Sequence, residues 1–168
     1  MKKRISFVAV LLFVVALTGC VGGAGLAPKP IDEKVDVCAN CSMTVMDNQF
    51  AAQIVVDAKT VDKFDDIACM AVYIVKGIAL EGTCYVRDFY SLEWVSTETA
   101  LFASSEKVMT PMNSGFVAFA DKSSLDAFLA EYTGEEVSWA DVMDTMKMRR
   151  EMMSTDDNGP MGSEMMLH

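Results

Sequence analysis

Residues 50–77 read FAAQIVVDAKTVDKFDDIACMAVYIVKG, and this stretch decides the fold class. Phe50 to Asp57 is apolar and β-branched, which predicts a strand, and Val61 to Phe64 predicts a second strand after a polar turn. Asp65 can cap a helix that runs to about Lys76, because its apolar residues are spaced three and four apart and a glycine follows. The stretch therefore predicts two strands joined by a turn and followed by a helix.

The same order of elements recurs later in the chain. Cys84 to Phe89 predicts the strand that returns after the first helix. Gly115 to Ala120 then predicts a strand, Asp121 or Ser123 can cap a second helix, and Glu136 to Ser138 predicts its returning strand. Two such halves would pack as an α+β fold with antiparallel strands. Further short extended pieces are expected at 92–95, 101–103 and 107–109, and a last helix at 139–151.

The N-terminus predicts a lipoprotein signal. Three positive charges precede an apolar run from Ile5 to Leu17, which is too short to span a bilayer comfortably. The run ends Leu17-Thr18-Gly19-Cys20, which resembles the lipobox of bacterial lipoproteins, in which the cysteine is lipidated. We therefore predict a signal peptide at 1–19, a lipid on Cys20 and a flexible, glycine- and proline-rich tether at 20–35. The protein would be anchored to the extracytoplasmic face of a cell membrane.

The composition argues against several classes of function. The formal net charge is −10, and removal of the signal with its three positive charges brings it near −13, so the chain would repel nucleic acid. No phosphate-binding loop or nucleophile motif occurs, and the only histidine is His168 at the extreme end. Asp65 and Asp66 are better explained as helix-start charges than as a catalytic pair. We therefore expect a binding protein and not an enzyme.

The chemistry of the chain is expected in the stretch Cys38-Ala39-Asn40-Cys41-Ser42-Met43. A turn over its second and third residues can bring both thiols to one point, and Met43 can add a thioether. Thiolates and thioethers select soft metals, Cu(I) above all. Two alternatives stay open. One is a thiol–disulfide oxidoreductase, although no helix follows the pair directly, and the other is a structural zinc site completed by Cys69 and Cys84.

The other sulfur-containing residues are secondary candidates. Cys69 and Cys84 can each be a small buried hydrophobic residue, or the two can form a disulfide, and we do not assign them to the metal. Met112 follows Pro111 in a loop, so its thioether is free to reach a ligand.

Methionines are unusually frequent near the C-terminus. An amphipathic helix and a disordered tail at 151–168 explain them most simply, and a low-affinity Cu(I)-collecting arm that includes His168 is the alternative. The methionines in question are Met143, Met146, Met148, Met152, Met153, Met161, Met165 and Met166.

In combination, these motifs resemble the NosL family of membrane-anchored copper-binding lipoproteins, which are associated with the maturation of nitrous oxide reductase. The resemblance covers about residues 35–142. It is carried by Cys20, by CANCSM at 38–43, by FDDIACM at 64–70 and by TPMNSGFVAF at 110–119.

The resemblance implies a fold of two similar ββαβ units and a single Cu(I) site. Cys38, Cys41 and Met43 match the family's cysteine–methionine motif, and Met112 matches its second-half Pro-Met motif. This chain departs from the family in two places. Ser42 stands where the family often has glycine, and Asn113 follows the Pro-Met motif where some members have a histidine nearby, so sulfur must fill more of the metal's coordination shell.

The sequence thus predicts one copper-binding domain at 36–150, with sub-units at about 36–95 and 96–150. The expected function is that of a membrane-anchored, extracytoplasmic Cu(I) chaperone. It would deliver copper to a cuproenzyme, nitrous oxide reductase being the one that the resemblance implies. Its expected metal ligands are Cys38, Cys41, Met43 and Met112.

Overall fold

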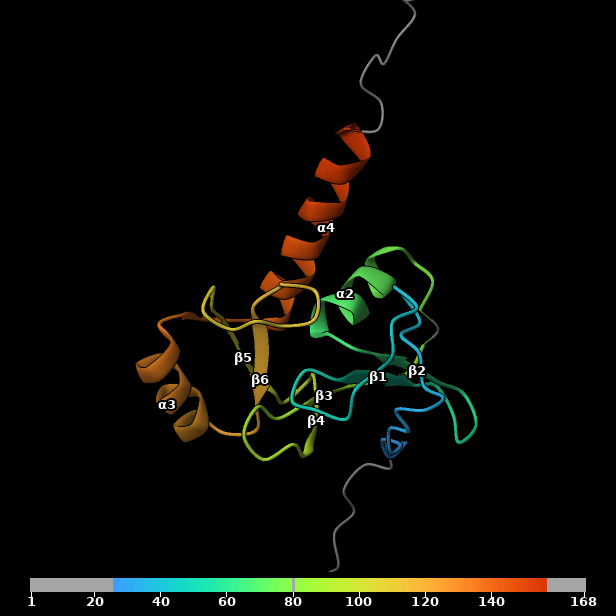
Figure 1. Ribbon diagram of the computed structural model, residues 1–168, viewed down its shortest axis with the longest axis horizontal. Helices are drawn as coiled ribbons and strands as arrows, with labels where there is room; N and C mark the ends of the chain where they lie inside the picture. The colour runs from blue at the N-terminus through green and yellow to red at the C-terminus, as the bar shows by residue number, and fades with distance from the viewer. Residues whose placement is uncertain (1–25, 80, 157–168) are drawn as a thin grey trace, which may run out of the picture.

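The computed structural model describes residues 26–79 and 81–156, which form two small antiparallel sheets and three helices (Figure 1). The predicted α+β class is confirmed. The expected signal peptide, the lipidated Cys20 and the end of the C-terminal tail lie outside the described residues. Within the described residues, no helix combines the length and the apolar character needed to cross a bilayer.

The first unit contains a four-stranded sheet in the order β2-β1-β3-β4 and one helix. The strand β1 is buried at all four of its residues and pairs antiparallel with both β2 and β3. Burial on both faces explains why apolar residues do not alternate with exposed polar residues along this strand. The elements are β1 (Ala52–Val55), β2 (Val61–Phe64), α2 (Ile67–Val75), β3 (Thr83–Arg87) and β4 (Trp94–Ser96).

The second unit repeats the first unit's ββαβ order with a three-stranded sheet, β6-β5-β7. In each unit the first strand lies between the second and the third, so the predicted pair of ββαβ units is confirmed. The repeat starts at β5, earlier than the echo visible in the sequence from Gly115 onward. The residues expected to be extended at 107–109 form a turn and a bend instead. The elements are β5 (Leu101–Ser104), β6 (Phe116–Phe119), α3 (Lys122–Tyr132) and β7 (Glu135–Val137).

The last helix, α4 (Trp139–Asp156), packs against α2 and then extends beyond the rest of the fold (Figure 1). Ser138 begins it by exchanging hydrogen bonds with Asp141, as in a capping box. Val142 and Met146 bury their side chains in a core cluster to which both units contribute residues. The helix runs past its expected end near Glu151, so the first residues of the expected disordered tail are helical.

The segment expected to be a flexible tether is bound to the sheet from Leu26 onward. Gln53 of β1 is fully buried, and its amide group exchanges hydrogen bonds of 2.9 and 3.2 Å with the backbone of Lys29. The Tyr85 hydroxyl donates to the Leu26 carbonyl, and Lys63 Nζ donates to the Pro30 carbonyl. A buried polar side chain needs such partners, which explains why this stretch is ordered although it contains prolines.

Candidate metal centre

The loop of residues 38–43 is closed by its own backbone. The amide of Cys38 donates to the Met43 carbonyl at 2.7 Å, and the amide of Ser42 donates to the Cys38 carbonyl at 2.9 Å. Ser42 has φ +63°, a left-handed conformation that glycine adopts without strain. The amide of Ala39 donates to the Lys63 carbonyl of β2 and fixes the loop to the sheet.

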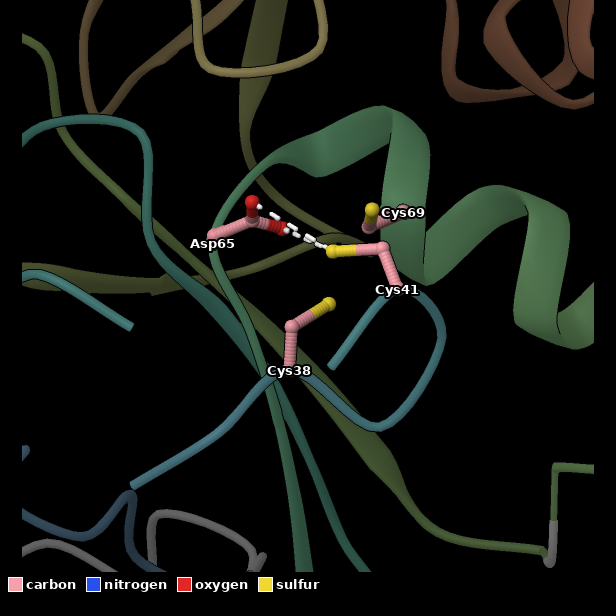
Figure 2. A group of neighbouring side chains, drawn as sticks. All are labelled: Cys38, Cys41, Asp65 and Cys69. Carbon is pink, nitrogen blue, oxygen red and sulfur yellow. Dashed lines mark hydrogen bonds between the residues drawn. The ribbon is translucent and has the colours of Figure 1, made fainter. Parts of the chain in front are cut away.

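Four side chains converge beside this loop. The sulfurs of Cys38, Cys41 and Cys69 and a carboxylate oxygen of Asp65 all lie within 4.8 Å of one another. Figure 2 shows the three thiols and the carboxylate turned toward a common point, two from the loop, one from the first turn of α2 and one from just before that helix. We call these four residues the thiol cluster.

The thiol cluster is enclosed on the protein side and opens at Cys41. Cys38 and Cys69 are 1% exposed and Asp65 is 4% exposed, whereas Cys41 is half-buried. The Cys41 thiol lies 3.6 Å from both carboxylate oxygens of Asp65 and donates toward them. The side-chain amide of Asn40 donates to Cys69 Sγ at 3.6 Å. An ion at this centre would therefore enter or leave on the side of the loop.

One of the three thiols ionises more readily than the others. The Cys69 thiol donates to Cys38 and, together with the backbone amides of Asp65 and Cys41, lowers the pKa of Cys38 to about 6 against the burial that opposes it. Burial, and then the neighbouring Cys38 thiolate, raises the pKa of Cys41 to about 11. The hydrogen bond to Cys38 and burial raise the pKa of Cys69 well above its ordinary value. Near neutral pH the metal-free cluster thus carries one thiolate, on Cys38.

We expect the ultraviolet absorbance of the metal-free, reduced protein to show one thiolate forming with a midpoint near pH 6. The step should disappear in Cys38→Ser and persist in Cys84→Ser. Because the pKa of Cys38 lies below the free-thiol value of 9.0, its ionisation stabilises the fold. That stabilisation is complete above pH 9 and is lost as the pH falls through about 6. A first step near pH 9 would contradict this assignment.

The two methionines predicted as ligands are both accessible to solvent. Met43 is 50% exposed and follows directly after the closed turn. Met112 is 41% exposed and shares a pocket with Cys69. The structure therefore brings Met112 from the second unit to the same side of α2 as the thiol cluster, while both thioethers remain accessible to solvent.

Asp66 fixes the position of Met112, a role that was not predicted from the sequence. Asp66, and not the expected Asp65, is the N-cap of α2, since its Oδ1 accepts from the amide of Ala68 at 2.7 Å. The same oxygen accepts from Ser114 Oγ, and Oδ2 accepts from the amide of Met112, both at 2.9 Å. The only signal in the sequence was a second aspartate directly before the helix, whose carboxylate can accept more hydrogen bonds than one helix cap requires.

The two cysteines outside the CxxC pair differ in their positions relative to the thiol cluster. Cys69 and Cys84 are both free thiols, so the disulfide considered for them is not formed. Cys69 belongs to the thiol cluster, although the sequence analysis left it out of the metal site. Cys84 lies in β3 opposite Ile54 and is not part of the cluster. A zinc site made of all four cysteines is therefore not assembled.

Comparisons with known proteins found a matching family model and a solved structure with a similar fold. The model of the NosL family matches residues 28–147. The crystal structure of the copper chaperone NosL from Shewanella denitrificans resembles this structure with a TM-score of 0.58 at 15% sequence identity. The match covers 68% of this chain and 93% of that chain, which shows a shared fold. A search among curated proteins found no match.

Proposed function

This chain belongs to the NosL family, and on that premise we propose that it is a Cu(I) chaperone held at the extracytoplasmic face of a membrane by a lipid on Cys20. Its cargo would be one Cu(I) ion, bound by the Cys38 and Cys41 thiolates, with Cys69 and the thioethers of Met43 and Met112 as further sulfur donors. The recipient we propose is a cuproenzyme, nitrous oxide reductase above all.

The observation that carries this proposal is the convergence of three free thiols within 4.8 Å of one another. Cu(I) is a soft ion that favours thiolates and thioethers over nitrogen and oxygen ligands. The surroundings are also negative, since the Cys38 thiolate and Asp65 lie together in the thiol cluster and attract a cation. The donors and their charge therefore suit a monovalent soft metal.

The burial of the donors suits transfer as well as binding. Cys38 and Cys69 are enclosed, whereas Cys41 is half-buried and Met43 is half-exposed on the same loop. A ligand from a recipient could replace the accessible sulfurs one at a time while the buried thiolates still hold the ion. The ion would then pass between proteins without being released to water.

One feature favours a second candidate function. The pKa of Cys38 is lowered to about 6, and two further thiols lie beside it, which is also the arrangement of a thiol–disulfide oxidoreductase. The site differs from such enzymes because the CxxC pair lies in a closed turn and not at the start of a helix. The oxidoreductase would reduce or exchange disulfides without any metal.

A competition titration of the reduced protein tests the proposal. We expect one tightly bound Cu(I) per protein in the presence of a Cu(I) chelator, and no displacement of that ion by excess Zn(II). A parallel assay should find no disulfide reduction by the metal-free protein. Absence of cuprous binding, or preferential binding of Zn(II) through the three thiols and Asp65, would overturn the proposal.

A further inference from the structure

A second sulfur-lined space adjoins the thiol cluster at Cys69. It is lined mainly by residues of α2 and α4. It is a pocket of about 290 Å³, open to solvent on one side. Most of its wall is apolar or sulfur-containing, and its rim is basic. The lining residues are Asn40, Ala68, Cys69, Val72, Lys76, Met112, Met146, Arg149, Arg150 and Met153. We call this space the methionine pocket.

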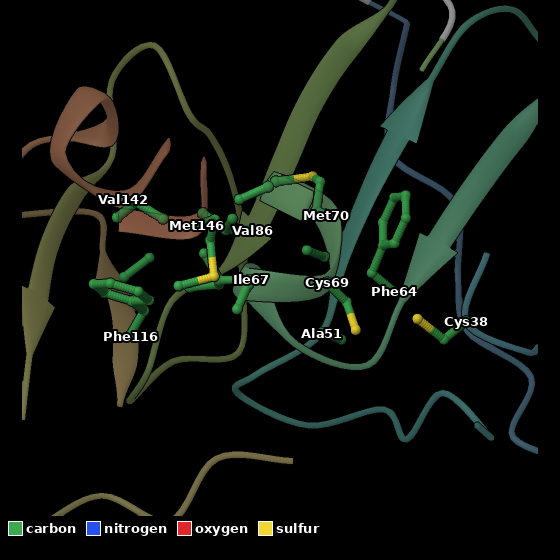
Figure 3. Packing of buried hydrophobic residues seen from close by; sticks show 14 of the residues in the cluster. Cys38, Ala51, Phe64, Ile67, Cys69, Met70, Val86, Phe116, Val142 and Met146 are labelled. Atoms are coloured by element: carbon green, nitrogen blue, oxygen red, sulfur yellow. The ribbon is translucent and has the colours of Figure 1, made fainter. Parts of the chain in front are cut away.

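Three segments contribute sulfur to the methionine pocket. Cys69 comes from α2, Met112 from the loop fixed by Asp66, and Met146 and Met153 from α4. The two α4 methionines are seven residues apart and therefore lie on the same side of that helix, two turns from one another. Met146 is 3% exposed, in the core near Ile67 and Val142 (Figure 3), whereas Met153 is 73% exposed at the mouth of the pocket.

We propose that Met112, Met146 and Met153 form, with Cys69, a second and weaker Cu(I) site that exchanges its ion with the thiol cluster. The inference rests on the proposed function and extends it to a defined route. Cys69 is the link, because its sulfur lies within 4.8 Å of Cys38 and Cys41 and also forms part of the pocket wall. An ion that stays bound to the Cys69 sulfur can thus exchange its other ligands between the thiol cluster and the methionine pocket.

The accessibility of the methionines suits this role. Met153 is 73% exposed, so its thioether can meet an incoming ion, whereas Met146 offers its sulfur from the buried wall of the pocket. Neutral thioethers bind Cu(I) without a negative charge, so they hold it less tightly than the thiolates do. The four sulfurs therefore suit brief occupation by the ion.

The charges around the two sites give the transfer a direction. Lys76, Arg149 and Arg150 line the methionine pocket and repel a cation, while the Asp65 carboxylate in the thiol cluster attracts one. An ion in the pocket would therefore move toward the thiol cluster. The same basic rim disfavours free hydrated copper and favours delivery from a donor that holds Cu(I) as an anionic thiolate complex.

The test is a titration of the full-length reduced protein with Cu(I) against a pair of chelators, one strong and one weak. The wild type should take up one tight equivalent and one weaker equivalent. In Met146→Leu/Met153→Leu the weaker equivalent should lose at least about a hundredfold in affinity, more than the loss of one outer-shell partner would cost, while the tight one is unchanged. Leucine keeps the apolar volume, so the fold should be retained. Met112 is left unchanged because it is also a candidate ligand of the first site.

Met148→Leu is the matched control, since Met148 lies on the same helix, is 56% exposed and does not line the pocket. It should bind both equivalents as the wild type does. In the wild type with labelled methionine methyl groups, the second equivalent should shift the signals of Met146 and Met153 and leave that of Met148 in place. If the weaker equivalent persists in the double variant, the inference is wrong, whatever other methionines bind it. If the wild type binds no tight equivalent of Cu(I), the proposed function itself is wrong.

Discussion

Cys38→Ala/Cys41→Ala is expected to lose tight Cu(I) binding almost completely. The change removes the Cys38 thiol, which is already ionised at neutral pH, and the Cys41 thiol, which is the partly exposed one of the thiol cluster. Loss of an outer-shell partner alone lowers metal affinity by about 10- to 100-fold, so loss of two direct ligands should cost at least about a thousandfold. The measurement is the same chelator competition, with the bound copper counted per protein.

Two controls show whether the loss is specific. Cys84→Ala removes a half-buried thiol from β3, outside the thiol cluster, and should leave Cu(I) binding unchanged. Because Cys38 is buried in the core, cooperative unfolding of the double variant has to be shown in denaturant, and Cys41→Ala alone provides a less disruptive version. Tight binding of one Cu(I) by the folded double variant would show that the thiol cluster is not the copper site.

Asp66→Ala is expected to destabilise the protein by about 3 kcal/mol, the sum of a lost helix cap and of buried donors left without an acceptor. Asp66 is fully buried and accepts from Ala68, Ser114 and Met112 at the same time. Its removal would both weaken the start of α2 and release the loop that carries Met112. Urea unfolding monitored by circular dichroism measures the change.

The repeated architecture supplies a matched control for this prediction. Asp121 is the N-cap of α3, as Asp66 is of α2, but it is exposed and its partners are the nearby Ser123 and Ser124. Asp121→Ala should therefore destabilise the protein clearly less. Asp66→Asn keeps one oxygen for Ala68 and Ser114 but cannot accept from the Met112 amide through its nitrogen. It should fall between wild type and Asp66→Ala, and equal losses for Asp66→Ala and Asp121→Ala would show that the bridge to Met112 adds nothing.

Local signals predicted most of the secondary structure correctly. The apolar, β-branched run before residue 57 and the spacing of apolar residues after Asp66 are properties of neighbouring residues, so β1 and α2 follow from them directly. The errors lie at boundaries and in weak segments. The cap was expected one residue early, at Asp65, because two aspartates in succession offer the same local chemistry.

The pairing of β5 with β6 and β7 was not predictable in the same way. β5 has the short sequence Leu101–Ser104, and nothing in those residues states that its partners are Phe116–Phe119 and Glu135–Val137. Its place in the middle of the second sheet comes from long-range pairing. For the same reason the sequence showed only a shortened form of the internal repeat.

The α+β class, the family and the CxxC turn could be predicted from local sequence, because propensity, capping and motif spacing act between residues that are close along the chain. Long-range packing was needed to bring Cys69 and Asp65 to Cys38 and Cys41, to keep Cys84 apart, and to bring Met112 to α2. These contacts join residues more than twenty positions apart, and they depend on how the sheet, the helices and the buried Asp66 pack together.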